Sequence, residues 1–169
     1  SEELYDLMKQ IINLDFKEPN RFNHKNLYWN YRISGIQASL GISQINSLNK
    51  TINLKIKQGE AYNHLFKSHT DFLQIPLSNV NESKNHYWVY GILLKQEGIR
   101  DDVVNYLESI GIQTRPFFWP MSKQDVFIKL KLFKKKSFPN SSYLSKYGLY
   151  LPASLSIKDQ DIKFICKKI

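Results

Sequence analysis

Cysteine is nearly absent from this chain, and long apolar runs are missing altogether. The single cysteine, Cys166, excludes a disulfide within the chain. It lies next to Ile165 in an apolar helical pattern, which is typical of a buried small residue rather than of a nucleophile. No run is long enough to cross a bilayer, and no signal peptide is evident. We therefore expect a cytoplasmic location with no membrane partner, and we predict no metal site.

Basic residues outnumber acidic ones, and the formal net charge is +9. An excess of this size is compatible with nucleic acid, with an anionic surface, or with a phosphate-bearing cofactor and substrate. The lysines cluster only at Lys129, Lys131 and the run 134–136, which is most simply interpreted as a solvated loop. The chain carries no recognised nucleic-acid motif, so we expect no nucleic acid partner. A basic module that stacks bases on exposed rings remains the alternative from a different class of protein.

A polar turn runs directly into a long helix near the N-terminal end of the chain. Ser34 and Gln37 have the spacing of a capping box, in which each side chain bonds the backbone of the other residue. Asn30 and Arg32 lie just ahead of this helix N-terminus, where free N–H groups and the helix dipole favour an anion. Two simpler roles stay open, an Asn30 that bonds its own turn and an Arg32 that forms a surface ion pair. An apolar face is expected at Ile36, Leu40, Ile45, Leu48 and Ile52.

Hydrophobic periodicity predicts an α/β protein in which one long helix lies beside a smaller unit of strands and helices. Helices are expected over 2–14, 34–65 (one bent helix or two), 101–110, parts of 122–148, and from 156 onward. Strands are expected over 86–94, 112–115 and 150–152. Gly111 is expected to end the third helix at its C′ position, and Pro116 to stop the second strand. Ser156 and Asp159 have the spacing of a second capping box.

One arginine and a stiff aromatic segment follow Gly111. Arg115 precedes three aromatic residues that are held between two prolines, and each proline restricts its own backbone and that of its neighbour. A guanidinium can hold a phosphate or carboxylate through two parallel bonds, and aromatic rings can stack on a base. The alternative is that Phe117 and Phe118 are core residues and Arg115 is an ion-pair partner.

Two segments resemble the sugar-nucleotide aminotransferases of the DegT/DnrJ/EryC1/StrS family. The first is the Asn-Tyr-Arg of residues 30–32 with the Gln-Ala-Ser-Leu-Gly of 37–41 and Gln44. It departs from the family pattern at Tyr28, Trp29, Ile33 and Ser39. The second is the Thr-Arg-Pro-Phe-Phe-Trp-Pro-Met of 114–121, which is most similar to members that aminate C4 of GDP-4-keto-6-deoxymannose with glutamate as amino donor.

The resemblance implies the C-terminal small domain of a fold-type-I transferase that uses pyridoxal 5'-phosphate, with the large domain mostly missing. Residues 1–33 would be a remnant of the large domain, and 34–169 would form the long helix and the small α/β domain. The lysine that forms a Schiff base with the cofactor is expected outside this chain. No catalytic residue is therefore assigned within it, and we expect the isolated chain to be inactive.

Roles for individual residues also follow from the resemblance. Asn30 would bind the cofactor phosphate of a neighbouring subunit, because the family forms homodimers that share the active site. Glutamate and a nucleotide-sugar would be the substrates, contacted by Arg32, Tyr31, Arg115, Phe117, Phe118 and Trp119. Two alternatives stay open within the fold, a GDP-sugar 3-dehydratase that has histidine in place of the lysine, and a subunit that only dimerises with a catalytic partner.

Overall fold

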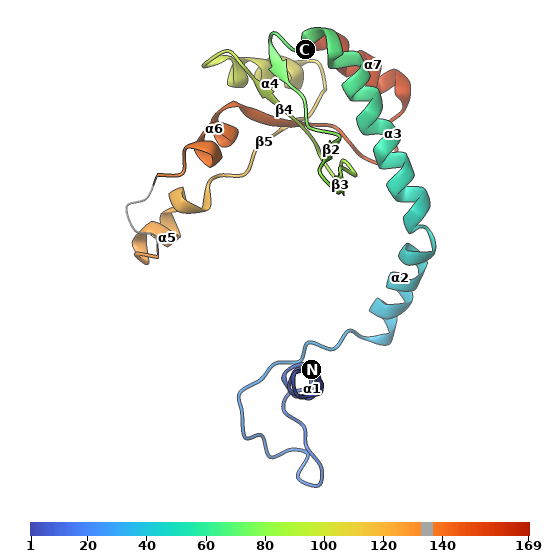
Figure 1. Ribbon diagram of the computed structural model, residues 1–169, viewed down its shortest axis with the longest axis vertical. Helices are drawn as coiled ribbons and strands as arrows, with labels where there is room; N and C mark the ends of the chain where they lie inside the picture. The colour runs from blue at the N-terminus through green and yellow to red at the C-terminus, as the bar shows by residue number, and fades with distance from the viewer. Residues whose placement is uncertain (133–136) are drawn as a thin grey trace. The chain divides into compact units, whose positions relative to one another are not determined.

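The computed structural model describes residues 1–132 and 137–169, and it divides into two compact units, Ser1–Leu48 and Asn49–Ile169 (Figure 1). The predicted lysine run at 134–136 lies outside the described residues. The boundary predicted between residues 33 and 34 separates a remnant of the large domain from the small domain, and it stays a prediction.

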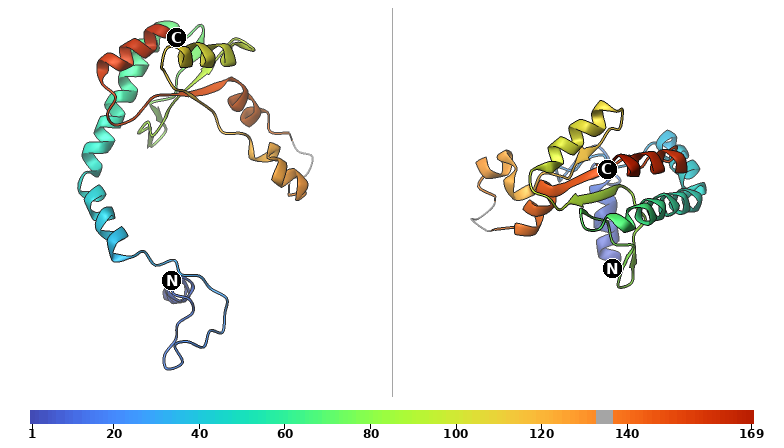
Figure 2. Two further views of the ribbon diagram at one scale, coloured as in Figure 1. Left: turned by 180° about the vertical axis from the view of Figure 1, so that it is seen from behind. Right: turned by 90° about the horizontal axis from the view of Figure 1, so that it is seen from above.

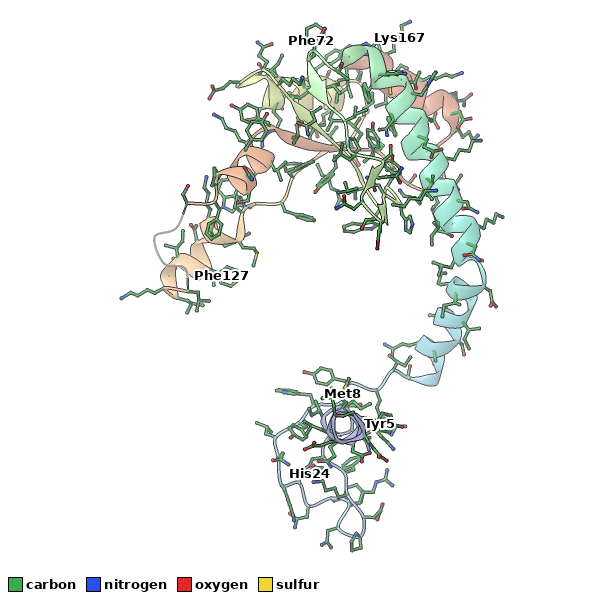
Figure 3. The ribbon with its side chains drawn as sticks, in the orientation of Figure 1. Tyr5, Met8, His24, Phe72, Phe127 and Lys167 are labelled. Atoms are coloured by element: carbon green, nitrogen blue, oxygen red, sulfur yellow. The ribbon has the colours of Figure 1, made fainter. Side chains whose placement is uncertain are left out.

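The first unit consists of two helices and the loop between them. Helix α1 spans Glu2–Ile11, and Ser1 Oγ accepts a hydrogen bond from Leu4 N at 3.3 Å. The helix ends three residues earlier than predicted, because Leu14 and Asp15 adopt left-handed backbone conformations with φ of 58°. Helix α2 spans Gly35–Asn46. Large apolar side chains of α1 are exposed, and Tyr5 and Met8 are each more than half accessible (Figure 3).

The predicted long helix is two helices. Helix α2 ends at Asn46, Ser47 is its C-cap, and α3 spans Leu48–Phe66. The predicted apolar face was placed too early along this segment, since its members Ile36, Leu40, Ile45 and Leu48 are exposed. The buried positions of α3 lie in its second half instead, at Gln58, Gly59, Tyr62 and Phe66.

The second unit is built on a four-stranded sheet with the order β1-β4-β6-β5, in which all neighbours are antiparallel. Its strands are β1 Leu73–Gln74, β4 Tyr90–Leu94, β5 Arg115–Pro116 and β6 Gly148–Leu151. Ile92 pairs with Leu149 in the centre, and Arg115 pairs with Tyr150 at the edge. Pro116 therefore lies within β5 rather than after it. An edge strand tolerates a proline because it forms ladder hydrogen bonds with a neighbour on one side only.

Strand β4 begins at Tyr90, four residues later than predicted, because the preceding segment is not extended. Tyr87 has φ of 49° and is buried, with a ring that occupies the space over Gly59. A small hairpin that the sequence did not predict precedes it, formed by β2 Asn79–Val80 and β3 Ser83–Lys84.

The remaining helices of the second unit are η1 Lys67–His69, α4 Ile99–Ser109, η2 Met121–Lys123, α5 Asp125–Lys129, α6 Pro139–Tyr147 and α7 Asp159–Lys168. Gly111 has φ of 81° and closes α4 as predicted, with its N–H bonded to Glu108 O and that of Ile112 bonded to Leu107 O. Helix α7 starts later than predicted. Its N-terminus is closed by Asp161, whose Oδ2 accepts from Lys158 N at 2.9 Å.

One hydrophobic core joins α3, α4 and α7 to the sheet (Figure 2). Tyr62 and Tyr90 stack at its centre with ring centroids 4.4 Å apart. Cys166 is buried in it, as predicted from its apolar neighbours. The other fully buried side chains include Phe66, Leu73, Ile92, Leu107, Leu149 and Ile162.

Candidate functional site

The turn before α2 is a polar corner fixed by backbone pairing. Asn30 forms a β-bridge with Asn13, and Tyr31 N donates to Ile12 O at 3.0 Å. Asn30 Oδ1 accepts from Arg32 N at 3.1 Å, which is an Asx-type turn. Arg32 Nη1 donates to Asn13 Oδ1 at 3.1 Å. Asn30 therefore bonds the backbone of its own turn, which was the simpler of its two expected roles. This bond occupies only the oxygen of its amide group.

The predicted capping box is present at the start of α2. Ser34 N donates to Gln37 Oε1 at 2.8 Å, and Gln37 N donates to Ser34 Oγ at 3.3 Å. These residues line an open pocket of about 350 Å³ together with Asn30 and Arg32. Arg32 is the only charged residue in the lining, so the pocket favours an anion.

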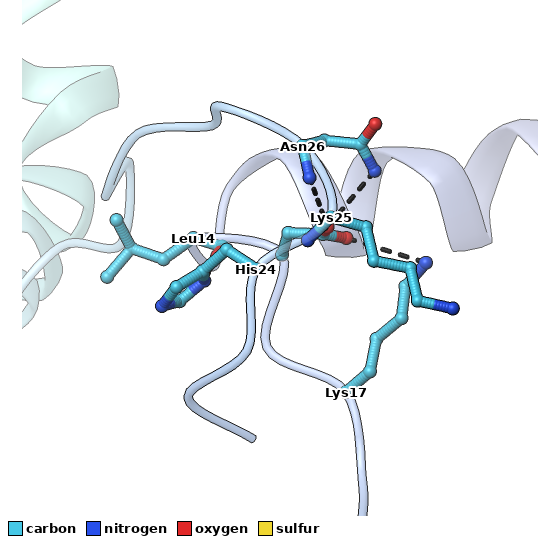
Figure 4. A network of polar contacts seen from close by, with 6 residues as sticks. Leu14, Lys17, His24, Lys25 and Asn26 are labelled. Atoms are coloured by element: carbon cyan, nitrogen blue, oxygen red, sulfur yellow. Dashed lines mark hydrogen bonds and ion pairs between the residues drawn. The ribbon is translucent and has the colours of Figure 1, made fainter. Parts of the chain in front are cut away.

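The buried carboxylate of Asp15 organises the loop beside this pocket (Figure 4). Its Oδ2 accepts from Lys25 N at 3.1 Å, from Asn26 N at 2.9 Å and from Asn26 Nδ2 at 3.0 Å. Its Oδ1 lies 3.5 Å from Lys17 Nζ. Burial raises the pKa of Asp15, but the hydrogen bonds from Asn26 and Lys25 and the charge of Lys17 outweigh it, so the net pKa is lowered. The sequence gives no signal for this role, because the hydrogen-bond donors lie ten and eleven residues away.

His24 closes the same loop. Its Nδ1 bonds the backbone oxygen of Leu14 (Figure 4). Its ring contacts Phe16 with centroids 5.2 Å apart. Leu14 and Phe16 both line the pocket at the polar corner. His24 therefore supports one wall of that pocket through the backbone.

A second and larger pocket of about 830 Å³ lies in the second unit, along β5 and the end of α4. We call it the sheet-edge pocket. Arg115 and Phe118 both line it, so the structure brings together two of the predicted substrate residues. Phe118 is 73% exposed and meets Tyr150 edge-on with centroids 5.9 Å apart. Lining residues that sequence reasoning missed include Trp88, Glu108, Gln113 and Tyr150.

Phe117 has a different position from its neighbour. Its ring stacks on Tyr150 with centroids 4.4 Å apart and an interplanar angle of 22°. It covers Gly91 and Gly148, where an added Cβ would come within 2.7 Å and 2.4 Å of the Phe117 ring. The two glycines thus make room for Phe117, which anchors β5 on the sheet and is not part of the sheet-edge lining.

Trp119 and Tyr31 do not line the sheet-edge pocket. Trp119 borders a separate pocket of about 510 Å³ with Arg100, and its Nε1 donates to Lys123 O at 2.9 Å. Tyr31 is 64% exposed and belongs to the first unit.

Helix α3 holds the segment that forms one wall of the sheet-edge pocket. Gln58 Nε2 donates to Ser154 O at 3.0 Å and to Ile157 O at 3.2 Å. Tyr62 donates its hydroxyl to Pro152 O at 2.8 Å, and burial raises the pKa of that hydroxyl. Pro152 and Ser154 both line the pocket. Side chains of α3 therefore fix the backbone of this wall.

The model of the DegT/DnrJ/EryC1/StrS aminotransferase family matches residues 1–169, and the chain belongs to this family. It is 28% identical to GDP-perosamine synthase from Vibrio cholerae, spanning all of this chain and 45% of that protein. It is 25% identical to GDP-perosamine synthase from Escherichia coli O157:H7, over 98% of this chain and 43% of that protein. The chain thus spans less than half the length of these relatives.

Solved structures have the same fold. The aminotransferase TlmJ from Streptoalloteichus hindustanus superposes with a TM-score of 0.85 at 18% identity, over 99% of this chain and 44% of that one. The E. coli GDP-4-keto-6-deoxy-D-mannose-3-dehydratase with bound hydrated PLP superposes with a TM-score of 0.83 at 20% identity, over 99% of this chain and 48% of that one. The predicted fold class, a partial transferase of this type, is confirmed.

Two other kinds of site are not found within residues 1–132 and 137–169. No helix in these ranges is both long and apolar enough to span a bilayer. No cluster of three or more histidine, cysteine, aspartate or glutamate side chains suited to a metal ion occurs there either.

Proposed function

We propose that this chain is the C-terminal part of an aminotransferase that uses pyridoxal 5'-phosphate. The enzyme would move the amino group of glutamate to a keto-sugar nucleotide, with GDP-4-keto-6-deoxymannose as the substrate and GDP-perosamine as the product. The names of the two relatives from V. cholerae and E. coli support this substrate. A cytoplasmic homodimer with a shared active site belongs to the same proposal.

The observation that carries the proposal is the polar corner before α2. A phosphate needs hydrogen-bond donors, and Asn30 offers them because its oxygen is already engaged by Arg32 N. Within the described residues, Asn30 Nδ2 has no hydrogen-bond partner, and Arg32 uses only one of its guanidinium nitrogens, on Asn13. The residues present therefore fit an anionic group such as the cofactor phosphate or a carboxylate.

Each residue of the corner then has a role. Pyridoxal phosphate, when bound, supplies the electron sink for amino transfer, and the protein supplies binding and orientation. Asn30 would donate its Nδ2 hydrogens to the phosphate, and Arg32 would hold the carboxylate of glutamate. Tyr31, exposed between them, would line the site.

The sheet-edge pocket would receive the sugar nucleotide. Arg115 would bind phosphate oxygens, and the exposed ring of Phe118 would contact a flat group of the substrate. Phe117 would act by anchoring β5, and Trp119 would contribute from the neighbouring pocket.

The test uses an enzyme that contains this chain together with the lysine-bearing portion of the family. It is incubated with pyridoxal phosphate, glutamate and GDP-4-keto-6-deoxymannose, and the product is analysed by mass spectrometry. A 4-amino sugar supports the proposal, whereas a 3-deoxy sugar assigns the chain to the dehydratase alternative. The 169-residue chain alone should yield neither product, because no residue in it matches the family's lysine motif.

Two variants test the corner in the same enzyme. Asn30→Ala should reduce the cofactor retained after desalting, and Arg32→Gln should raise KM for glutamate by about 10- to 100-fold while leaving KM for the sugar unchanged. Asn23→Ala is a matched control, because Asn23 is exposed in the preceding loop and contributes only a backbone bond. Normal cofactor retention in Asn30→Ala would contradict the assignment.

A further inference from the structure

The sheet-edge pocket contains two opposite charges that do not pair. Arg115 on β5 and Glu108 near the end of α4 both line it. Neither side chain forms an ion pair or side-chain hydrogen bond with the part of the chain that the structure describes. Glu97 and Lys146, which do not line this pocket, by contrast form an ion pair with one another. Such a pocket suits a ligand with an anionic group that can bind the unpaired Arg115 and with hydrogen-bond donors that can bind the unpaired Glu108.

The pocket also presents flat apolar surface and an unused hydroxyl. Trp88 is 76% exposed and Phe118 is 73% exposed, and both line the pocket. Large rings exposed beside a cation are typical of surfaces that stack a base and bind its phosphates. Thr114, next to Arg115, has a buried Oγ1 with no hydrogen-bond partner among the described residues. A buried hydroxyl without a partner costs free energy unless a ligand or water meets it.

Only some nucleobases complement a carboxylate. Guanine presents two adjacent donors, N1–H and N2–H, that can bond the two oxygens of one carboxylate side by side. Uracil and thymine present a single N–H flanked by two carbonyl oxygens, which a carboxylate repels. Adenine presents one amino group beside a ring acceptor. A site built to pair a donor set discriminates strongly against analogues that lack it.

We infer that Glu108 reads the base of the nucleotide-sugar and that the sheet-edge pocket selects guanine over pyrimidines. The inference rests on the proposed function for its nucleotide-sugar ligand, and it adds the residue that determines the base. Glu108 accepts from guanine N1–H and N2–H, Trp88 and Phe118 cover the ring, and Arg115 holds the diphosphate.

Nucleotide binding to the full 169-residue chain tests this without cofactor or turnover. GDP and UDP are titrated by isothermal calorimetry into the native chain and into Glu108→Gln, which keeps the size of the side chain but removes one acceptor and the charge. Asp102→Asn is the matched control, since Asp102 is exposed on the same helix and is absent from the pocket lining. Circular dichroism of each variant verifies that it is folded.

GDP should bind the native chain about 10- to 100-fold more tightly than UDP, which is the range expected for hydrogen bonds to a charged group. Glu108→Gln should bring GDP affinity down to that of UDP and leave UDP unchanged, while Asp102→Asn changes neither. Arg115→Gln should weaken both nucleotides equally. Equal affinity for GDP and UDP, no measurable binding of either, or unchanged GDP affinity in folded Glu108→Gln would overturn the inference.

These outcomes are independent of the reaction. An enzyme that fails to form an amino sugar refutes the proposed function even when its guanine preference is intact. A native chain without base preference, or a Glu108→Gln variant that keeps it, refutes only the role of Glu108 when amino transfer is normal.

Discussion

The side chain of Gln58 on α3 is a buried hydrogen-bond donor, and its replacement by a glutamate should destabilise the second unit strongly. The side chain is 3% exposed, and its Nε2 supplies both hydrogen bonds to Ser154 O and Ile157 O. Gln58→Glu preserves the shape of the side chain and exchanges this donor for an oxygen. At neutral pH a carboxylate would then face two carbonyl oxygens inside the protein.

The magnitude follows from the bonds lost. Two hydrogen bonds contribute about 1 kcal/mol each, and leaving their acceptors and a buried charge uncompensated adds at least about 1 kcal/mol. We expect a loss of about 3 kcal/mol or more, which lowers the melting temperature by about 6–12 °C for a chain of this size. The pKa of the introduced glutamate is raised in the folded state because burial and the carbonyls disfavour its charge. The Gln58→Glu variant is therefore more stable at low pH, where the neutral carboxyl can donate one hydrogen bond. This contribution to its stability is lost as the pH rises through the raised pKa.

Thermal melts followed by circular dichroism at two pH values measure both effects. Gln160→Glu is the matched control, because Gln160 is exposed on α7 and has no side-chain partner among the described residues. A Gln58→Glu melting temperature within about 2 °C of the control at neutral pH would refute the reasoning. So would a deficit that does not shrink on acidification.

Three further predictions concern packing, titration and reactivity. Gly59→Ala should cost about 3 kcal/mol or more in a denaturant melt, because its Cβ would lie 2.1 Å from Cγ of the buried Tyr87 ring. Asp15 has a pKa below its ordinary value of 3.8, so its contribution to stability is complete above that pH and is lost as the pH falls through the lowered pKa; the Asn26 amide resonance in NMR should shift only in that range. Burial raises the pKa of the Cys166 thiol to about 12, so a disulfide reagent at pH 8 should react slowly with the folded chain and quickly in denaturant.

Controls are available for each of these. Gly41→Ala should preserve or slightly increase stability, because nothing lies within 4 Å of its added Cβ. Asp15→Asn should abolish the low-pH shift, and a shift that persists would assign it to another group. Rapid labelling of Cys166 without denaturant would show that the core is open at α7.

The sequence predicted features whose partners are close along the chain. The capping box at Ser34 and Gln37 and the Gly111 terminus of α4 each depend on bonds within five residues. The start of β4 was predicted incorrectly because Tyr87 turns into a left-handed conformation over Gly59, which is 28 positions away. The start of α7 was wrong because Asp161, rather than Asp159, bonds back to the residue before the helix.

The candidate site divides in the same way. Arg115 and Phe118 were predicted from one short motif, and they line one pocket. Glu108 and Trp88 line it too, although they come from a helix and from the segment before a strand, and only the fold places them beside Arg115. Phe117 and Phe118 are adjacent in sequence, yet one packs on glycines of the sheet and the other is exposed.

The proline in β5 limits how the sheet can grow. Phe117 N bonds Gly148 O on the inner side of the strand, so the nitrogen of the preceding residue faces outward, and Pro116 has no hydrogen to offer there. The opposite border is β1, which is only two residues long. A foreign strand therefore finds no continuous row of donors at either margin, and this small sheet is protected against the edge-to-edge stacking that leads to aggregation.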